Sequence, residues 1–170
     1  MIDIIEYKKL DNDTVLNLNE IIDAEFGHIP LVKNTQWAIP DWTIIYSQNE
    51  TLAAFYNIIE REVIMDDEKV KVAGVNNVIT LKKYRGKGFS ARLLKDTQHF
   101  IFDELRSKFG LLLCADTLIP YYQKLNWYKV DCPVYFSQPT GKKLWAANTM
   151  LLSNSHYENP ELIDLNGLPW

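Results

Sequence analysis

A basic, glycine-bearing segment in the middle of the chain has the residue types that bind a phosphate group. Residues 78–81 are mostly apolar and predict the end of a strand, the basic stretch 82–87 follows, and an amphipathic helix is expected from about Gly88. The first amide groups of a helix lack intrahelical partners and carry a partial positive charge. Glycines at positions 86 and 88 have no Cβ to keep a ligand from the backbone. The segment therefore predicts an anion site at a helix N-terminus.

The spacing of the glycines excludes the commoner phosphate-binding loops. A P-loop needs a glycine, four residues and then Gly-Lys-Ser/Thr, which the run Gly86-Lys87-Gly88-Phe89 does not supply. A dinucleotide fingerprint, Gly-x-Gly-x-x-Gly, is matched only through Ala91 in the last position, and too little chain remains for the further βαβ repeats that fold requires.

The pattern Arg85-x-x-Gly88-x-Ser90 resembles the acetyl-CoA pyrophosphate loop of the GNAT superfamily of N-acetyltransferases, usually Gln/Arg-x-x-Gly-x-Gly/Ala. Ser90 departs from that pattern, although its side chain is small. The resemblance implies that the loop binds pyrophosphate and that the preceding strand holds the pantetheine arm of acetyl-CoA; without it, the strand residues would be ordinary core. The cofactor-binding residues implied are Val78, Ile79, Thr80, Arg85, Gly86, Lys87, Gly88, Phe89 and Ser90.

A second segment resembles the same superfamily. Residues 111–115 predict a buried strand, 121–125 a helix, and Asn126 a left-handed residue before a strand at 127–130. The resemblance places Tyr122 where many members carry a tyrosine that protonates the departing CoA thiolate, a role that suits a phenol with a pKa near 10. The alternative is that Tyr122 is a half-buried helix aromatic.

A further resemblance rests on the block Tyr84–Leu94, the Pro120-Tyr121-Tyr122 helix leading to Trp127, the Gln138-Pro139-Thr140-Gly141 turn and the final Trp170. From about residue 70 to the end, these segments are similar to aminoglycoside 2′-N-acetyltransferases. As substrate-binding residues we expect Trp170, whose carboxylate could face an ammonium group, and the aromatics that could wall a cleft, Trp37, Trp42 and Tyr135. These aromatics could equally belong to the core. Leu168 stands where that subfamily has an acidic residue, which makes aminoglycosides one candidate among several amines.

The general base is left open by the sequence. Asn76 occupies the position of the subfamily's glutamate, and an amide cannot accept a proton usefully. A water chain, Glu60, Glu62 or Asp116 could replace it, although each of these carboxylates could also be simply solvated.

The elements that must position these residues follow from hydrophobic periodicity and turn residues. We expect strands at 2–7, 42–46, 52–64, 70–80, 111–115, 127–130, 134–136 and 148–152, helices at about 15–26, 88–108 and 121–125, and an extended, packed tail at 153–170. The order predicts an α/β (mixed α+β) chain forming one domain, 1–170. It matches the GNAT-type acyl-CoA N-acyltransferase fold, a mixed, mostly antiparallel central sheet flanked by helices.

Composition limits the other functions. The net charge of −4 argues against a nucleic-acid partner, and we expect no membrane span, no signal peptide and a cytoplasmic location. Cys114 and Cys132 are expected to be free thiols. His28, His99 and His156 lack the spacing of metal ligands, so no metal is expected.

These observations favour an acetyl-CoA-dependent N-acetyltransferase that acts on a primary amine of a small molecule by direct attack in a ternary complex. Two alternatives stay open: a GNAT-fold domain that binds CoA without catalysis, which Asn76 favours, and an acetyltransferase for protein N-termini or lysines. A homodimer is also left open.

Overall fold

The computed structural model describes residues 1–155 and 158–170, and its strands form one mixed sheet. The strands are β1 (Ile2–Glu6), β2 (Trp42–Gln48), β3 (Thr51–Met65), β4 (Glu68–Thr80), β5 (Phe109–Cys114), β6 (Tyr128–Val130), β7 (Val134–Gln138), β8 (Gly141–Leu144), β9 (Asn148–Leu152) and β10 (Ile163–Asp164). The helices are α1 (Asn12–Phe26), α2 (Pro30–Lys33), α3 (Phe89–Asp96) and α4 (Ile119–Gln123), with 3₁₀ turns at Tyr7–Lys9, Lys82–Tyr84 and Asp116–Leu118. This architecture confirms the predicted fold class.

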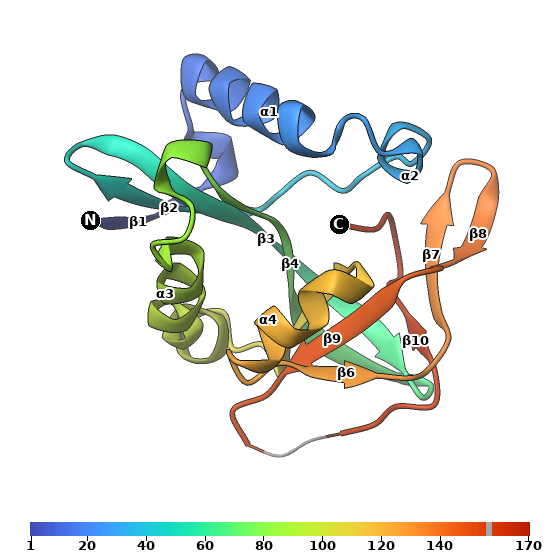
Figure 1. Cartoon of the computed structure of the whole chain (residues 1–170). Coiled ribbons are helices and arrows are strands. Elements are labelled where there is room, and N and C mark those ends of the chain that lie inside the picture. Colours follow the sequence, from blue (N-terminus) through green and yellow to red (C-terminus); the bar gives the residue numbers. More distant parts are fainter. Residues whose placement is uncertain (156–157) are drawn as a thin grey trace.

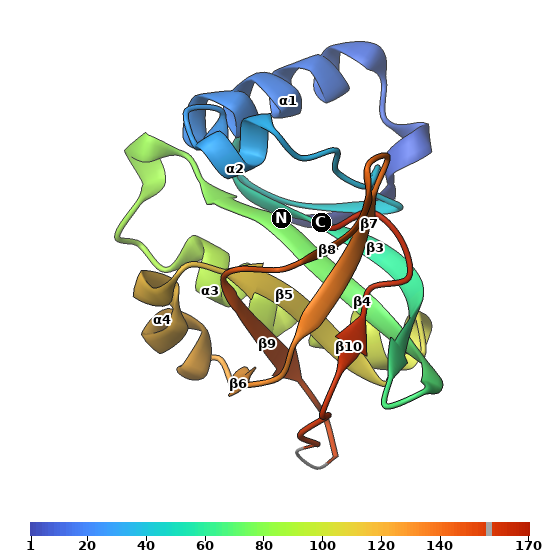
Figure 2. The ribbon, with the colours of Figure 1, turned by 90° about the vertical axis from the view of Figure 1, so that its right-hand side faces the viewer.

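The sheet runs β6-β9-β5-β4-β3-β10-β7-β8, and β2 and β1 continue from the first half of β3. Most neighbours are antiparallel, but β4 and β5 are parallel because α3 connects them. Helices α1 and α2 lie on one side of the sheet and α3 and α4 on the other (Figures 1 and 2).

We call these sides the α1 face and the α3 face. The α3 face buries Val75, Leu93 and Tyr122 in one core. The α1 face buries Ile79 beneath α1 and, further along β3 and β4, a second core that includes Trp170. Alternation along β3 and β4 assigns each side chain to one face, which later decides from which side a ligand can reach it.

The long helix predicted at 88–108 is wrong in its second half. Helix α3 ends at Asp96, and after a break the chain forms a π-helical turn at Phe100–Glu104. The Thr97 hydroxyl donates to the Leu93 carbonyl oxygen at 2.7 Å and lies 2.6 Å from the buried Tyr56 hydroxyl. A Thr that bonds back to its own helix bends it, and Tyr56 lies on β3, so this partner could not be read from local periodicity.

In the C-terminal half, the structure differs from the predicted elements in one place and confirms them in another. Residues 141–144 form β8 and pair with β7, a hairpin missed because all four residues of β8 are exposed and lack apolar alternation. The tail packs in extended form, as predicted: Ile163 and Leu165 are fully buried. In the described part of the chain, no helix has the length and hydropathy needed to cross a bilayer.

Candidate functional site

The site begins where β4 and β5 separate. Their pairing ends at Val75 and Leu112, and no other described strand pairs with this edge of β4 beyond that point. One residue later β4 carries a bulge, because Asn57 lies opposite Asn76 while Phe55 lies opposite Ile79. The bulged stretch of β4 contains Asn77, whose backbone lies in the left-handed region with φ 52°. A bulge bends its strand, and the parallel strands here leave a gap between them.

The backbone of β4 presents hydrogen-bonding groups along this gap. The Leu81 N–H donates to the Ala53 carbonyl oxygen of β3, and Ile79 lies opposite Phe55. Because these groups alternate along a strand, those of Ile79 face β3 while those of Val78 and Thr80 face the gap. The Ile79 side chain is buried beneath α1, so of the three predicted strand residues Val78 and Thr80 have backbone groups that a ligand in the gap could reach.

The turn from β4 into α3 leaves backbone amides free. Gly86 and Gly88 both have φ 74°, and a Cβ built on either would meet no atom within 4 Å. Gly88 is the N-cap of α3 and has no side chain to cap the helix. The first helical hydrogen bond runs from the Arg92 N–H to the Gly88 carbonyl oxygen, so the amides of Phe89, Ser90 and Ala91 precede it. These features fit the pyrophosphate of coenzyme A, which needs amide donors and close backbone approach.

The positively charged side chains of this turn have different partners. The Arg85 guanidinium is 2.6 Å from Glu25 of α1 and donates from Nε to the Thr80 carbonyl oxygen, so it braces the turn against α1. The Lys83 and Lys87 ammonium groups lie 4.9 and 5.5 Å from the centroid of the Tyr84 ring.

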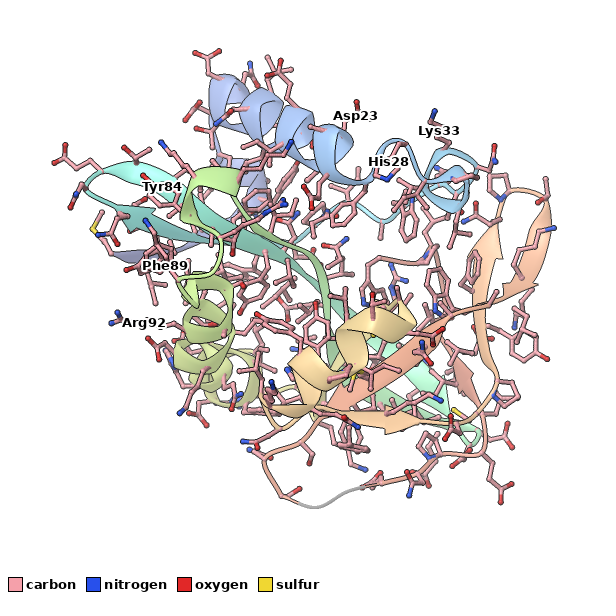
Figure 3. The ribbon with its side chains drawn as sticks, in the orientation of Figure 1. Asp23, His28, Lys33, Tyr84, Phe89 and Arg92 are labelled. Atoms are coloured by element: carbon pink, nitrogen blue, oxygen red, sulfur yellow. The ribbon has the colours of Figure 1, made fainter. Side chains whose placement is uncertain are left out.

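Tyr84 and Phe89 lie together where the turn enters α3 (Figure 3), with ring centroids 5.9 Å apart. The Phe89 ring therefore anchors the start of α3 by packing, while its backbone N–H is one of the amides that precede the first hydrogen bond of α3.

Tyr122 lies on α4, beside the end of β5. Its side chain is 6% exposed, and its hydroxyl has no hydrogen-bond partner among the described residues. Burial raises the pKa of the Tyr122 phenol above its usual value, with smaller contributions from Tyr121 and Cys114. The phenol therefore stays protonated at neutral pH, and the raised pKa makes it a weaker acid than an exposed tyrosine.

Its neighbour Tyr121 has a structural link that the sequence did not indicate. The Tyr121 hydroxyl lies 2.9 Å from the Ser90 hydroxyl, which ties α4 to the first turn of α3. The Ser90 amide is therefore among those that precede the first hydrogen bond of α3, while its hydroxyl is hydrogen-bonded to Tyr121.

Cys114 ends β5 in the same core as Tyr122. Burial and the nearby Asp116 carboxylate raise the pKa of its thiol to about 11. Because only the thiolate is a good nucleophile, this cysteine is poorly suited to carry an acyl group.

Candidate bases are spread over different parts of the sheet. Glu60 accepts from the Trp42 indole at 2.8 Å and pairs with Lys71 at 3.0 Å, opposite Ala73 and away from the gap. Glu62 is exposed two residues further along β3, opposite Lys71. Asp116 lies two residues beyond the end of β5, and its carboxylate accepts from the Asn148 amide at 2.7 Å. Of the three carboxylates considered from the sequence, only Asp116 lies at the gap end of its strand.

Asn76 lies on the α1 face at the gap. It follows Gly74 by two positions, so its side chain shares the face on which Trp170 packs. Its amide oxygen is buried and has no hydrogen-bond partner among the described residues. That oxygen can accept an N–H group from a ligand, although it cannot take up the proton.

The three tryptophans predicted to bind substrate are not brought together. Trp37 packs edge-on against Trp145, with centroids 6.3 Å apart. Trp42 packs on Phe100 on the α3 face. Trp170 is 3% exposed and donates to the Leu111 carbonyl oxygen at 3.2 Å, so its indole is part of the core.

The described residues contain no group of three or more His, Cys, Asp or Glu side chains that could hold a metal ion. Both cysteines are free thiols, as predicted. His156 lies outside the described residues.

The residue at this site that the sequence analysis did not single out is Asn77. Its signal was available, because Asn tolerates the left-handed region and two consecutive Asn residues interrupt an otherwise apolar strand. The bulge itself could not be predicted from the sequence, because a bulge is defined by the register with the partner strand.

Comparisons with known proteins agree with this geometry. Solved structures with a similar fold include Escherichia coli ElaA (16% identity, TM-score 0.66, covering 90% of this chain and 99% of that one). A GNAT family acetyltransferase from Brucella melitensis in complex with acetyl-CoA is 10% identical (TM-score 0.55, 94% and 93% covered). Escherichia coli YhbS, a GNAT family N-acetyltransferase in complex with CoA, is 12% identical (TM-score 0.56, 98% and 89% covered).

No curated protein matches the chain in sequence. A family model described as "Acetyltransferase (GNAT) domain" matches residues 6–130, well over half of the chain. With the uncapped α3 turn and the gap beside β4, this match shows that the chain belongs to the GNAT family of acetyltransferases.

Proposed function

We propose that the chain transfers the acetyl group of acetyl-CoA to a primary amine of a small molecule, with both substrates bound at once. One observation carries the proposal: the free backbone groups of β4 at the β4–β5 gap lead directly into the uncapped N-terminus of α3. A diphosphate with a long, hydrogen-bonding arm matches this arrangement of donors, because the turn binds charge and the strand edge binds amides.

The chain's own residues divide the binding work. Gly86 to Ser90 offer amide donors for the pyrophosphate, with Lys83 and Lys87 adding positive charge beside them. Val78 and the Thr80 N–H offer backbone groups to the pantetheine arm, while the Thr80 carbonyl oxygen already accepts from Arg85. Acetyl-CoA supplies an activated thioester, so the protein's remaining tasks are orientation and proton transfer.

Proton transfer is assigned to Tyr122. Its phenol is buried, protonated at neutral pH and close to the end of β5, so it can donate to the departing CoA thiolate if that sulfur lies there. Cys114 lies in the same core, but its raised pKa leaves it protonated and a poor nucleophile. These two side chains support direct attack by the amine over transfer through an acetyl-cysteine.

The acceptor is expected to reach the gap from the α1 face, because α3 and α4 cover the other face (Figure 2). There the Asn76 amide oxygen can orient the amine by accepting one of its N–H groups. The amine must arrive neutral or lose its proton to water, since Asn76 is no base.

An aminoglycoside remains one candidate, but this face argues for a less charged amine. The Arg61 guanidinium lies 5.2 Å from the Trp170 ring centroid and donates to the Leu168 carbonyl oxygen. A cation therefore lies beneath the tail, at the residue where the aminoglycoside enzymes carry an acid, and it disfavours a polycation.

The test is thiol release from acetyl-CoA against a panel of amines that includes aminoglycosides, polyamines, amino-acid amides and a peptide N-terminus. We expect release with at least one small primary amine and saturation kinetics in which both substrates bind before any product leaves. Release only with the peptide would reassign the acceptor to proteins. Coenzyme A binding with no release across the panel would leave a CoA-binding domain without transferase activity.

A further inference from the structure

The Tyr121 side chain bridges the two helices that carry the candidate site. Helices α3 and α4 lie side by side on the α3 face of the sheet (Figures 1 and 2). The Tyr121 hydroxyl of α4 lies 2.9 Å from the Ser90 hydroxyl in the first turn of α3. Among the described residues, this is the one side-chain hydrogen bond that α4 makes. It joins the helix that carries the proposed proton donor, Tyr122, to the turn that is proposed to bind the pyrophosphate.

Helix α4 has little stability of its own to fix its position. It has five residues, and no described side chain caps its N-terminus. Isolated helices this short are unstable in water, so contacts with the rest of the protein decide where α4 lies. Packing supplies part of this contact, because the Tyr122 ring packs edge-on against Tyr121 and Trp127. Apolar packing is non-directional, whereas a hydrogen bond fixes the distance between two particular atoms.

The shape of coenzyme A explains why such a bond matters. Its pyrophosphate and its sulfur are joined by the pantetheine arm, so binding of the pyrophosphate at α3 limits where the sulfur can lie. A proton donor to that sulfur must be placed relative to the same turn, to within the reach of roughly 2.6–3.2 Å that proton transfer needs. Ser90 provides the reference point, because its amide precedes the first hydrogen bond of α3 and its hydroxyl is bonded to Tyr121.

The residue types make this link a property of this chain. Ser90 stands where the GNAT pattern usually has Gly or Ala, neither of which has a hydroxyl. Both Ser90 and Tyr121 are partly buried, which shelters their hydrogen bond from competing water. Burial also raises the pKa of the Tyr121 phenol, so this phenol stays protonated and the bond persists at neutral pH.

Resting on the proposed function, we infer that Tyr121 is a positioning residue for proton transfer. Its hydrogen bond to Ser90 holds α4 against the pyrophosphate turn and so places the Tyr122 phenol at the sulfur of bound coenzyme A. Tyr121 acts through Tyr122 and itself gives up no proton. Its loss therefore lowers kcat and leaves coenzyme A binding intact.

The first test removes the two hydroxyls singly and together. Tyr121→Phe removes one hydroxyl, and Ser90→Ala removes the other while keeping its backbone amide. Each variant should lower kcat roughly fivefold, the effect of one lost hydrogen bond, and leave the Kd of coenzyme A within about twofold of the native value. The double variant should lose no more than either single variant, because both changes break the same bond. Losses that multiply in the double variant would overturn the inference.

The second test repeats Tyr121→Phe in a Tyr122→Phe background. If Tyr121 acts through the Tyr122 phenol, removing its hydroxyl in that background should change kcat by less than about twofold. A structural role alone predicts the same roughly fivefold loss in both backgrounds, and that result would overturn the inference.

Tyr128→Phe is the matched control. The Tyr128 hydroxyl also bonds to a neighbour, the Glu158 backbone, at 3.1 Å from its carbonyl oxygen and 3.2 Å from its amide nitrogen. Tyr128 lies on β6, two strands beyond β5, and packs on the α1 face. This variant should keep the native kcat and the native Kd of coenzyme A. A loss of kcat equal to that of Tyr121→Phe would attribute the effect to general destabilisation and overturn the inference.

A measurement that needs no acceptor separates this inference from the proposed function. In NMR spectra of protein isotope-labelled at the tyrosine Cζ atoms, the Tyr122 signal is the one that Tyr122→Phe removes. Saturating coenzyme A should shift this signal in the native protein and not in Tyr121→Phe. That result without thiol release to any amine supports the placement of the phenol and overturns the transferase.

The opposite pattern overturns the inference alone. Thiol release that falls in Tyr122→Phe but is unaffected by Tyr121→Phe leaves the transferase standing and removes the positioning role. A Tyr122 signal that coenzyme A shifts equally in the native protein and in Tyr121→Phe, or that it shifts in neither, overturns the inference as well.

Discussion

Replacing Gly88 by Ala separates backbone strain from phosphate binding. Gly88 has φ 74°, and the new Cβ would meet no atom within 4 Å, so the variant suffers backbone strain but no steric clash in the free protein. The left-handed conformation costs a residue with a Cβ about 1 kcal/mol. For a domain of this size, that lowers the midpoint of thermal unfolding by about 2–4 °C.

The effect on coenzyme A binding should be larger than the effect on stability. The space around the Gly88 Cβ position is where the backbone of the turn is approachable, and a methyl group there would keep a phosphate from the amides that precede the first hydrogen bond of α3. Loss of one hydrogen bond to a charged group costs about 1.5–3 kcal/mol, so the dissociation constant should rise at least about tenfold. Isothermal titration calorimetry with coenzyme A measures this change.

Gly141→Ala supplies the matched control for this experiment. Gly141 also has a positive φ, 112°, and open space at its Cβ position, but it begins β8, away from the α3 turn. We expect this variant to lose comparable stability and to bind coenzyme A like the native chain. Native affinity in Gly88→Ala, or an equal loss of affinity in Gly141→Ala, would refute the assignment of the turn as the phosphate site.

Three further predictions concern other parts of the molecule. Tyr122→Phe should lower kcat about 100-fold, the scale of general acid catalysis, while leaving the affinity for coenzyme A unchanged; unchanged turnover would remove the phenol from the mechanism. Gly74→Ala places a Cβ 2.2 Å from the Trp170 ring and should lower the free energy of unfolding in urea by about 1–3 kcal/mol; an unchanged midpoint would contradict the packing of the tail. In a Cys132→Ser background, the pKa of about 11 at Cys114 predicts that alkylation by iodoacetamide rises about tenfold per pH unit from pH 7 towards that value, because only the thiolate reacts; a plateau below pH 9 would contradict the burial of the thiol.

The parts of the fold that depend on local chemistry were predictable from the sequence. Asp11 is the N-cap of α1, a position that aspartate favours, and its carboxylate accepts from the Thr14 N–H at 2.8 Å. Asn126 was expected in the left-handed region and has φ 66°. In each case one side chain and its own backbone decide the conformation, so neighbouring residues suffice.

The parts that depend on distant partners were not predictable. The helix at 88–108 follows a continuous apolar period, yet Tyr56 on β3 meets Thr97 and the helix ends. The bulge at Asn77 exists only relative to β3, and the gap it leads to exists only because β5 stops pairing at Leu112. Strand register is a property of two segments, and one segment's pattern fixes only which residues share a face.

The acceptor side shows this limit most clearly. An aromatic residue in a sequence can wall a cleft or fill a core, and its type does not distinguish the two. Gly74 decides the matter for Trp170, because the missing Cβ leaves room for the indole on β4 and the indole N–H then finds the Leu111 carbonyl oxygen. Trp42 is placed by Phe100, and Trp37 by Trp145, each an edge-on ring partner distant in the chain. Which partner each ring meets, a property of the folded chain alone, is therefore what separates a core tryptophan from one that walls a cleft.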